Sequence, residues 1–329
     1  MEKITTREGV RKLGKKLSNW GKWGSDDEIG TVNYVTGDSI IKAARLVKKG
    51  KVFHLGIELN LNGPQRHGYK GATRFNPIHV MFRSGSDTVA GVPQAYRDGA
   101  SWGGADDMIV LATQGGSHWD ALCHVHGEGG KMWNGYDARL CSSWGAEKNG
   151  IEKYSNKLVG RGVLLDVARY KGVKMLEPGY EISCEELDEC VGWEDVSVGS
   201  GDFLLVRTGK METFIERVEK GGDWGDYSRG VEAGLSIETA AWLHEKEVAA
   251  IVMDNWGCEV RPNATGAEMY QPWHRVVLPY MGLLMGENLN FKTLAEDCDE
   301  DKVYEFLFVA PPLLITGGAG TPINPYAIK

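Results

Sequence analysis

The sequence predicts an α/β protein built on a mixed β-sheet. In the middle of the 329-residue chain, short apolar strands alternate with helices, while the first third is richer in strands and loops. No stretch rich in Pro, Ser or charge divides the chain. We therefore expect a single domain over residues 1–329, with residues 1–35 as an N-terminal arm. The exposed part of that arm, Met1 to Trp23, could cross to a neighbouring subunit or remain a frayed tail.

The first third should contain one clear helix and three strands. Residues 36–49 carry Ile40, Ile41, Ala44 and Val47 at helical spacing, and Gly50 ends the pattern. Glycine, proline and aspartate bound three β-prone runs in the same region. These expected strands are Val52–Glu58, Ile78–Arg83 and Met108–Thr113.

The rest of the chain alternates buried strands with capped helices. Ser183 and Glu186 form a capping-box pattern that should open a helix reaching Val191. Two further helices are expected at Lys210–Lys220 and from a Ser236 cap to about Lys246. The expected strands are Gly162–Val167, Asp202–Arg207, Val248–Met253, Phe306–Val309 and Leu313–Thr316.

Composition excludes several classes of protein. The formal net charge of −8 gives no basic field for nucleic acid or anionic lipid. No apolar run approaches the roughly 20 residues of a spanning helix, so we expect no membrane segment. Six scattered cysteines without a C-x-x-C pair predict reduced thiols and a cytoplasmic location. The 44 glycines and 11 tryptophans favour a pocket built from loops, which suits a small-molecule partner.

One segment concentrates chemically active side chains. Between Gln114 and His126, three of the eight histidines fall within nine residues, with an aspartate between them. His118 and Asp120 are two residues apart, so an extended chain places both on one face, and Gln114 and His124 share that parity. Imidazole and carboxylate are the ligands of catalytic Zn or Mn sites, which keep an open position for water. The alternative is a hydrogen-bonded His–Asp pair on a sheet, without metal.

This segment, QGGSHWDALCH, resembles the signature H-x-G-T-H-x-D-x-x-x-H of the cyclase-like metal-dependent hydrolases, the family of bacterial kynurenine formamidase and isatin hydrolase. Three other segments resemble the family. Trp23–Thr36 resembles the N-terminal signature of its longer members, Gly201–Gly209 its central strand and turn, and Gly317–Lys329 its C-terminal tail. Together they span nearly the whole chain. The resemblance implies a swivelling β/β/α domain with a metal at the edge of a mixed sheet, assembled as a homodimer or homotetramer.

The resemblance also implies a set of site residues. His118 and Asp120 match metal ligands, and His124 matches a final histidine that serves as acid/base or ligates a second metal. Gln114 stands in place of the first histidine, as glutamine does in longer members, and Ser117 stands in place of the threonine. His274 and Glu287 look like the remaining ligands, with a spacing one residue longer than in the short formamidases. The alternatives are a histidine on a helix surface and a solvated carboxylate.

The function implied is metal-dependent hydrolysis of an amide or lactone in a small molecule. A divalent metal, Mn or Zn, would be held by His118, Asp120, His274 and Glu287, with Gln114 as a further candidate ligand. His124 would move the proton. An amide oxygen at Gln114 would favour Mn or Mg over Zn and weaken metal retention, so the protein could purify partly empty. We expect one tightly held metal rather than a dinuclear pair. Substrate choice should lie in residues 65–75 and 92–104, and N-formylkynurenine, isatin and dienelactones are alternatives.

Other readings stay open at this point. A relative that binds an aromatic molecule without chemistry would also fit, because Gln114 weakens the metal site and tryptophans are plentiful. A metal-independent hydrolase would use Cys123 beside His124, although adjacent strand residues point to opposite faces. Trp119, Trp133 and Trp256 are candidate ring walls by residue type. Asp254 could be a partner of the site or a turn residue, His126 could compensate for Gln114, and His79 reads as a packed core histidine.

Overall fold

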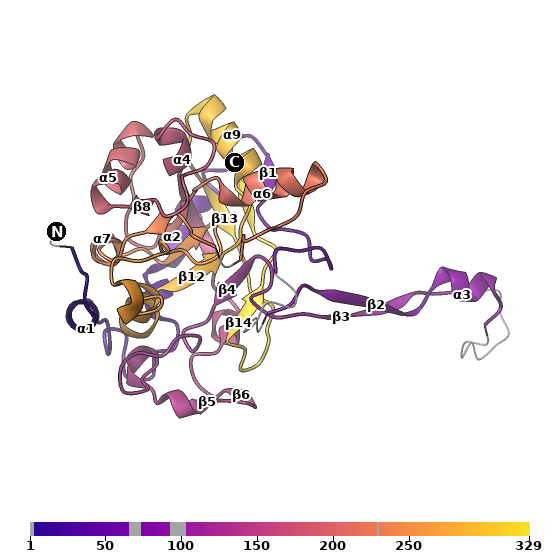
Figure 1. Cartoon of the computed structure of the whole chain (residues 1–329), viewed down its shortest axis with the longest axis horizontal. Helices are drawn as coiled ribbons and strands as arrows, with labels where there is room; N and C mark the ends of the chain where they lie inside the picture. Colours follow the sequence, from indigo (N-terminus) through magenta and orange to yellow (C-terminus); the bar gives the residue numbers. More distant parts are fainter. Residues whose placement is uncertain (1–2, 66–73, 93–102, 229) are drawn as a thin grey trace.

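The computed structural model describes residues 3–65, 74–92, 103–228 and 230–329. Its body is organised around one curled mixed sheet, from which a two-stranded ribbon projects (Figure 1). The nine strands of the sheet run in the order β1-β15-β13-β7-β9-β11-β12-β4-β14 within these residues. The predicted α/β class with a mixed sheet is confirmed.

The elements have the following bounds. The α-helices are α1 (Arg7–Lys16), α2 (Gly37–Ala44), α3 (Gly85–Val89), α4 (Val167–Tyr170), α5 (Cys184–Trp193), α6 (Lys210–Glu219), α7 (Thr239–Glu245), α8 (His274–Val276) and α9 (Lys292–Asp301). Shorter 3-10 and π segments are η1 (Gly30–Tyr34), η2 (Trp133–Gly135), η3 (Ala138–Leu140), η4 (Ile151–Tyr154), η5 (Gly266–Glu268) and η6 (Val277–Met281).

The strands of the large sheet are β1 (Val52–His54), β4 (His118–Asp120), β7 (Val159–Leu165), β9 (Phe203–Val206), β11 (Ala250–Met253), β12 (Leu284–Glu287), β13 (Glu305–Val309), β14 (Gly320–Pro322) and β15 (Tyr326–Ile328). Three two-stranded sheets pair β2 (Ile78–Arg83) with β3 (Asp106–Val110), β5 (Cys141–Ser142) with β6 (Gly145–Ala146), and β8 (Glu181–Ile182) with β10 (Gly234–Leu235).

The centre of the sheet is parallel and buried on both faces. Strands β7, β9, β11 and β12 run parallel to one another. Their sequences are nearly continuous apolar runs, as expected for strands covered by packing on both sides. Alternate residues face two hydrophobic clusters: Leu204 and Ile251 belong to one, and Phe203 and Val252 to the other.

Of the two helix caps that the sequence predicted, one is confirmed and one is wrong. The Ser183 hydroxyl accepts a hydrogen bond from the Glu186 backbone N–H, and the Glu186 carboxylate accepts one from the Ser183 backbone N–H. The predicted capping box is therefore confirmed. Thr36 caps α2 in the same way with Ser39. The Ser236 cap is wrong: α7 begins at Thr239, because residue 236 continues the backbone pairing of β10 through Ile182 O.

The expected strand at Leu313–Thr316 is also wrong. Those residues lie in loop and turn, and Leu313 N–H donates to the Thr321 hydroxyl (3.1 Å). Two prolines precede the run and cannot donate to a ladder, which favours a loop there. The C-terminal strands are instead β14 and β15, and β14 lines the outer edge of the sheet beside β4.

The N-terminal segment forms a helix that packs against the body. Val10, Leu13 and Leu17 are buried at helical spacing, and α1 contacts α8 and η6. A side chain at Gly14 would lie 2.8 Å from the Tyr280 ring, so glycine allows this close approach. Contacts of the arm with a second subunit stay a prediction.

A buried carboxyl away from the sheet edge sets one pH dependence. Glu194 is 4% exposed, one of its oxygens accepts from the Asp166 N–H (2.7 Å), and the other has no hydrogen-bond partner among the described residues. Burial raises the pKa of Glu194 from 4.5 to about 8, so the folded protein holds a proton that the unfolded chain releases.

The free energy of unfolding should therefore fall as pH rises from about 4.5 to about 8. Glu194→Gln keeps the hydrogen-bond acceptor and removes the titration. Between pH 5 and pH 8.5 the free energy of unfolding of this variant should therefore rise by roughly a few kcal/mol relative to that of the parent. Urea unfolding of both proteins at the two pH values measures this. Identical pH slopes would show that Glu194 does not titrate as stated.

No helix of the described residues is both long and apolar enough to cross a membrane.

Candidate metal centre

Strand pairing alone brings two distant parts of the chain together. β4 runs antiparallel to β12, and His118 pairs directly with Glu287. His118 and Asp120 point to one face of β4, while Trp119 between them packs in the core. At Gly286, which pairs with Trp119, a Cβ atom would lie 2.8 Å from the indole ring. Glycine there lets the strand that carries Glu287 pack closely against Trp119.

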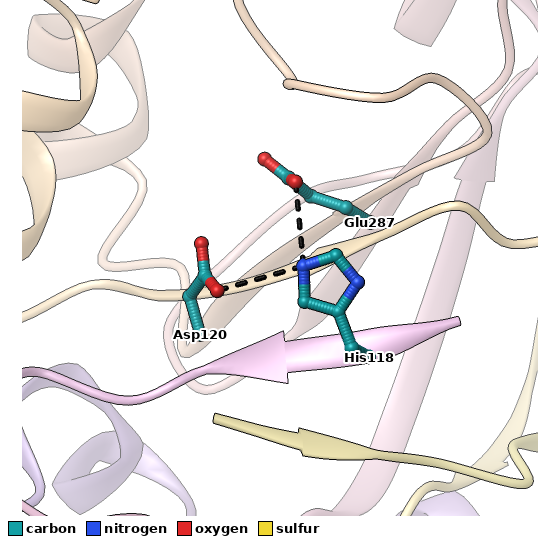
Figure 2. A group of neighbouring side chains, drawn as sticks. All are labelled: His118, Asp120 and Glu287. Carbon is teal, nitrogen blue, oxygen red and sulfur yellow. Dashed lines mark ion pairs between the residues drawn. The ribbon is translucent and has the colours of Figure 1, made fainter. Parts of the chain in front are cut away.

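The three side chains converge in the interior. His118, Asp120 and Glu287 are buried, and one ligand atom of each lies within 4.8 Å of the other two. His118 Nε2 is 3.5 Å from Asp120 Oδ1 and 3.4 Å from Glu287 Oε2 (Figure 2). The structure therefore brings together three of the five predicted ligands as one group that could hold a metal.

The donor atoms of this group fit a cation. His118 Nδ1–H donates to Gly116 O (2.8 Å), so in the neutral ring Nε2 carries the lone pair. That lone pair faces two carboxylates, and among the described residues neither Nε2 nor Asp120 Oδ1 has a hydrogen-bond partner. Such atoms repel one another in a dry interior unless a proton or a metal lies between them.

Without metal, the proton takes that place. Burial lowers the pKa of His118, but Asp120 and Glu287 outweigh it and raise the pKa to about 9. Burial likewise works against the charged form of Asp120, yet His124 and His118 hold its pKa below the usual value. The group thus attracts positive charge strongly enough to overcome desolvation.

His274 lies beside the group and is oriented by a carboxylate. Its Nδ1–H donates to Glu259, and its Nε2 is 3.2 Å from Glu287 Oε1. Glu259 also accepts from the backbone N–H groups of Trp273 (3.2 Å) and His274 (3.1 Å), which fixes the start of α8. His274 and Glu287 are 3% and 2% exposed, so the alternatives of a helix-surface histidine and a solvated carboxylate are wrong. Ligation by His274 stays a prediction.

Sequence reasoning missed Glu259. It lies fifteen residues before His274, outside the named strands and helices, and forms an isolated bridge with Leu235. A carboxylate that holds the far nitrogen of a ligand histidine raises its basicity and sets its orientation. From the sequence alone, Glu259 could have been suggested only as one of many carboxylates near the predicted ligands.

Glu259→Gln tests this orienting contact. The amide keeps the volume but loses the charge, so metal affinity should fall roughly 10- to 100-fold. Competition with a fluorescent chelator measures the affinity. Glu194→Gln is the matched control, because it makes the same change in another buried glutamate and should leave metal affinity unchanged. Equal affinities in parent and Glu259→Gln would contradict the role.

Gln114 and His124 form a second pair next to the triad. The Gln114 amide nitrogen donates to Ala319 O (3.2 Å) and lies 3.4 Å from His124 Nδ1, while its oxygen accepts from the Thr113 hydroxyl (2.8 Å). His124 Nε2 is 3.6 Å from Asp120 Oδ2. Gln114 therefore adjoins the site through His124, and its role as a metal ligand stays a prediction.

The environment of His124 favours the neutral ring. Burial lowers its pKa more than Asp120 raises it, and Arg74 lowers it further. Its side chain is 24% exposed, in contrast to the enclosed His118. A neutral, partly accessible imidazole beside a cation-binding group is suited to accept a proton.

The remaining candidates have structural roles. Cys123 is buried and its thiol lies 3.8 Å from Gly318 O, and burial raises its pKa well above the usual value, which disfavours a thiolate nucleophile. Asp254 accepts from Thr208 and Gly209 backbone N–H groups (2.8 and 2.7 Å), so it fixes the turn before α6. Burial raises the pKa of Asp254 to about 6.

Several aromatic and histidine predictions are corrected. Trp119 and Trp133 are fully buried in core clusters, so they are not ring walls, and Trp256 is 7% exposed. His79 is exposed on β2 and pairs with Asp107 (2.6 Å), so it is not a core histidine. His126 contacts Cys123 O (3.2 Å) and lines a cavity with residues of α1. The predicted substrate loops lie largely outside the described residues, at 66–73 and 93–102.

Comparisons with known proteins agree with this architecture. A crystal structure described as a novel cyclase is 36% identical, with a TM-score of 0.86, and the match covers 96% of this chain and 99% of that one. An isatin hydrolase bound to the product analogue thioisatinate is 16% identical (TM-score 0.58; 89% and 98% covered). A potential metal-dependent hydrolase with cyclase activity is also 16% identical (TM-score 0.51; 84% and 98% covered). These two distant matches concern the fold alone.

A search of curated proteins gives no match. A family model described as "Putative cyclase" matches residues 53–260, which is more than half of the chain. The resemblance inferred from the motif is thereby confirmed. Together with the 36% identity over nearly the whole chain, this match shows that the protein belongs to the cyclase family.

Proposed function

We propose that this protein is a metal-dependent hydrolase that cleaves an amide or lactone bond in a small molecule. The observation that carries the proposal is the buried group of His118, Asp120 and Glu287, whose facing lone pair and carboxylates need a cation between them. Structures of similar fold are named isatin hydrolase and metal-dependent hydrolase, which supports a hydrolytic activity.

The residues of the chain divide the work. His118, Asp120 and Glu287 would hold the metal, with His274 and Gln114 as further ligands. A divalent metal in such a site polarises a carbonyl and lowers the pKa of water. The neutral His124 imidazole would take a proton from the attacking water and deliver it to the leaving nitrogen or oxygen. Asp120 Oδ2 lies 3.6 Å from His124 Nε2, and the Gln114 amide nitrogen lies 3.4 Å from His124 Nδ1. These two neighbours orient the ring.

The metal should be Mn or Zn. Two carboxylates and an imidazole suit either ion, and an amide oxygen from Gln114 would favour the harder Mn. We propose one bound metal. The six cysteines are free thiols, which supports the proposed cytoplasmic location.

Metal analysis and a substrate panel test the function together. Protein purified without chelator should contain about one equivalent of Mn or Zn, or take it up when it is added. Chelated and reloaded samples are then assayed with N-formylkynurenine, isatin and dienelactones. Turnover that disappears on chelation and returns with metal supports the hydrolase. A protein that binds metal but hydrolyses no amide or lactone would overturn it.

One observation favours a second candidate, a relative that binds a small molecule without chemistry. Gln114 replaces the first histidine of the motif and its amide oxygen is engaged by Thr113 in this structure. This candidate predicts that ligands raise the melting temperature of chelated protein as much as that of metal-loaded protein, with no product formed.

We also propose that the protein is a homo-oligomer, held together by the β2–β3 ribbon. Ile78 pairs with Val110 and Val80 with Met108, so these four apolar side chains share one face, each at least 40% exposed. The ribbon projects away from the body (Figure 1), and within the described residues these four side chains are exposed. An isolated two-stranded ribbon is only marginally stable, so the partner that covers it should be present whenever the chain folds. A second copy of the same chain meets this condition.

Val80→Asp should shift the mass in solution to that of the monomer, because it places a charge within the apolar face. Light scattering after size exclusion measures the mass. Ile41→Asp is the control, since Ile41 is 54% exposed on α2 and should leave the assembly intact. A parent protein that is already monomeric would overturn the assembly but not the hydrolase.

A further inference from the structure

We propose that the substrate carries a carboxylate, and that Arg74 binds this group beside the metal centre. The inference rests on the proposed hydrolase function and narrows its substrate class. Arg74 belongs to the loop 65–75, where we expect substrate choice to lie. Its residue type alone did not identify it as a site residue.

The position of Arg74 is fixed by two contacts. Its Nη1–H donates to Gln114 O (3.4 Å), and its guanidinium carbon lies 5.3 Å from the centre of the Trp256 ring. Gln114 is the residue whose side chain adjoins His124. The cation is close enough to the centre for its charge to lower the pKa values of both Asp120 and His124.

Arg74 has no carboxylate partner among the described residues, although it is half-buried. Two arginines that are more deeply buried are paired with carboxylates. Arg261, which also lies over the Trp256 ring (4.7 Å), pairs with Glu232 (2.6 Å). Arg207 pairs with Asp166 and Glu212. The Arg74 guanidinium, with five N–H donors and one long hydrogen bond to the described protein, therefore has room to bind a ligand carboxylate.

The chemistry of this cation favours a carboxylate. A guanidinium binds a carboxylate through two parallel hydrogen bonds, and the flat ring of Trp256 holds the fork in one plane. The Trp256 Nε1–H is buried and also has no hydrogen-bond partner in the part of the chain that the structure describes. Two unused donors at one place beside the metal centre match a ligand rich in oxygen acceptors.

The competing explanation is that Arg74 only balances the charge of Asp120 and Glu287. A bound divalent metal already supplies that balance, which would leave the Arg74 charge in excess. A neutral ligand should be unaffected by the charge at position 74, whereas an anion feels it. Charge balance needs only the positive charge, which lysine keeps, whereas a carboxylate site also needs the guanidinium fork.

Binding of anthranilate and of its neutral amide, anthranilamide, tests the proposal. Calorimetry on metal-loaded and chelated protein should show that anthranilate binds the parent at least about 10-fold more tightly than the amide. Arg74→Gln should weaken anthranilate binding roughly 10- to 100-fold and leave the amide unchanged. Arg74→Lys, which keeps the charge but loses the fork, should fall between them.

Arg139→Gln is the matched control, because Arg139 is exposed and pairs only with Asp137, so anthranilate should bind it as it binds the parent. Circular dichroism confirms that each variant folds, and Arg74→Lys is the second test if Arg74→Gln does not. Equal anthranilate affinities in parent and both Arg74 variants would overturn the proposal, as would a parent that binds neither probe. So would an equal loss for acid and amide. Metal-dependent turnover of a neutral lactone, measured separately, keeps the hydrolase proposal independent of this result.

Discussion

Replacing His118 by alanine should remove both the metal and the activity. His118 contributes the only nitrogen of the buried triad, and its Nε2 lies 3.4–3.5 Å from both carboxylates. Without the imidazole, the buried triad keeps only its two carboxylates for the ion, beside the further ligands proposed above. Since the metal's Lewis acidity is worth several kcal/mol in the transition state, turnover should fall on the order of a thousandfold or more.

The same change should also destabilise the chelated protein. In the metal-free parent the His118 pKa of about 9 keeps a positive charge between Asp120 and Glu287 at neutral pH. His118→Ala leaves the two buried carboxylates facing each other without that charge, and an uncompensated buried charge costs about 3–5 kcal/mol. A double variant, His118→Ala with Glu287→Gln, should recover part of the stability and none of the activity.

Elemental mass spectrometry, thermal unfolding and turnover of the best substrate together measure these effects. His79→Ala is the control, because that histidine is exposed on the ribbon and pairs with Asp107. It should match the parent in metal content and turnover. Retention of a full equivalent of metal by His118→Ala would show that the ion lies elsewhere and would remove the basis of the proposed centre.

The motif predicted the geometry of His118 and Asp120 because their relation is local. Two residues on one extended strand must share a face, whatever the rest of the fold does. Their meeting with Glu287 depends on the pairing of β4 with β12, which joins segments 169 positions apart. Nothing in a three-residue strand such as β4 specifies that partner, so Glu287 came from the family resemblance rather than from periodicity.

The fold was predictable where apolar runs are long and buried. β9 and β11 were expected because FLLV and AIVM have no polar residue and are bounded by turn formers. Short edge strands such as β14 carry little pattern, and their pairing is decided by contacts with β4. Helix α1 does show Val10, Leu13 and Leu17 at helical spacing, but its many charges made it read as an arm.

Residues that act through others were beyond sequence reasoning. Glu259 orients His274 and Arg74 lies over Trp256, and each does so from a segment outside the main sheet. Their side chains are common surface residue types, and only their placement gives them a role. The sequence contains 45 Asp+Glu and 37 Lys+Arg. Without the fold, nothing separates Glu259 and Arg74 from the other 44 acidic and 36 basic residues.

Replacing His124 by glutamine should lower kcat by about 10²- to 10⁴-fold and leave metal content unchanged, because proton transfer by a positioned side chain contributes that much. Glutamine retains a polar group next to Gln114 but cannot accept a proton near neutral pH. KM should change little, since the triad that holds the metal is intact. His126→Gln is the matched control two residues away, and it should keep full activity because His126 contacts Cys123 O and not the triad.

This variant also separates the two roles that the family resemblance allows for His124. A ligand of a second metal would take part of the metal with it, so stoichiometry in His124→Gln would fall below that of the parent. A proton carrier leaves stoichiometry alone and removes the limb of the kcat profile that reports its titration. The lowered pKa of His124 places that limb below the ordinary histidine value of 6.5, so the parent should gain activity as pH rises through it. Full activity in His124→Gln would assign the proton transfer to another group, and the neutral imidazole beside Asp120 would then have only a structural role.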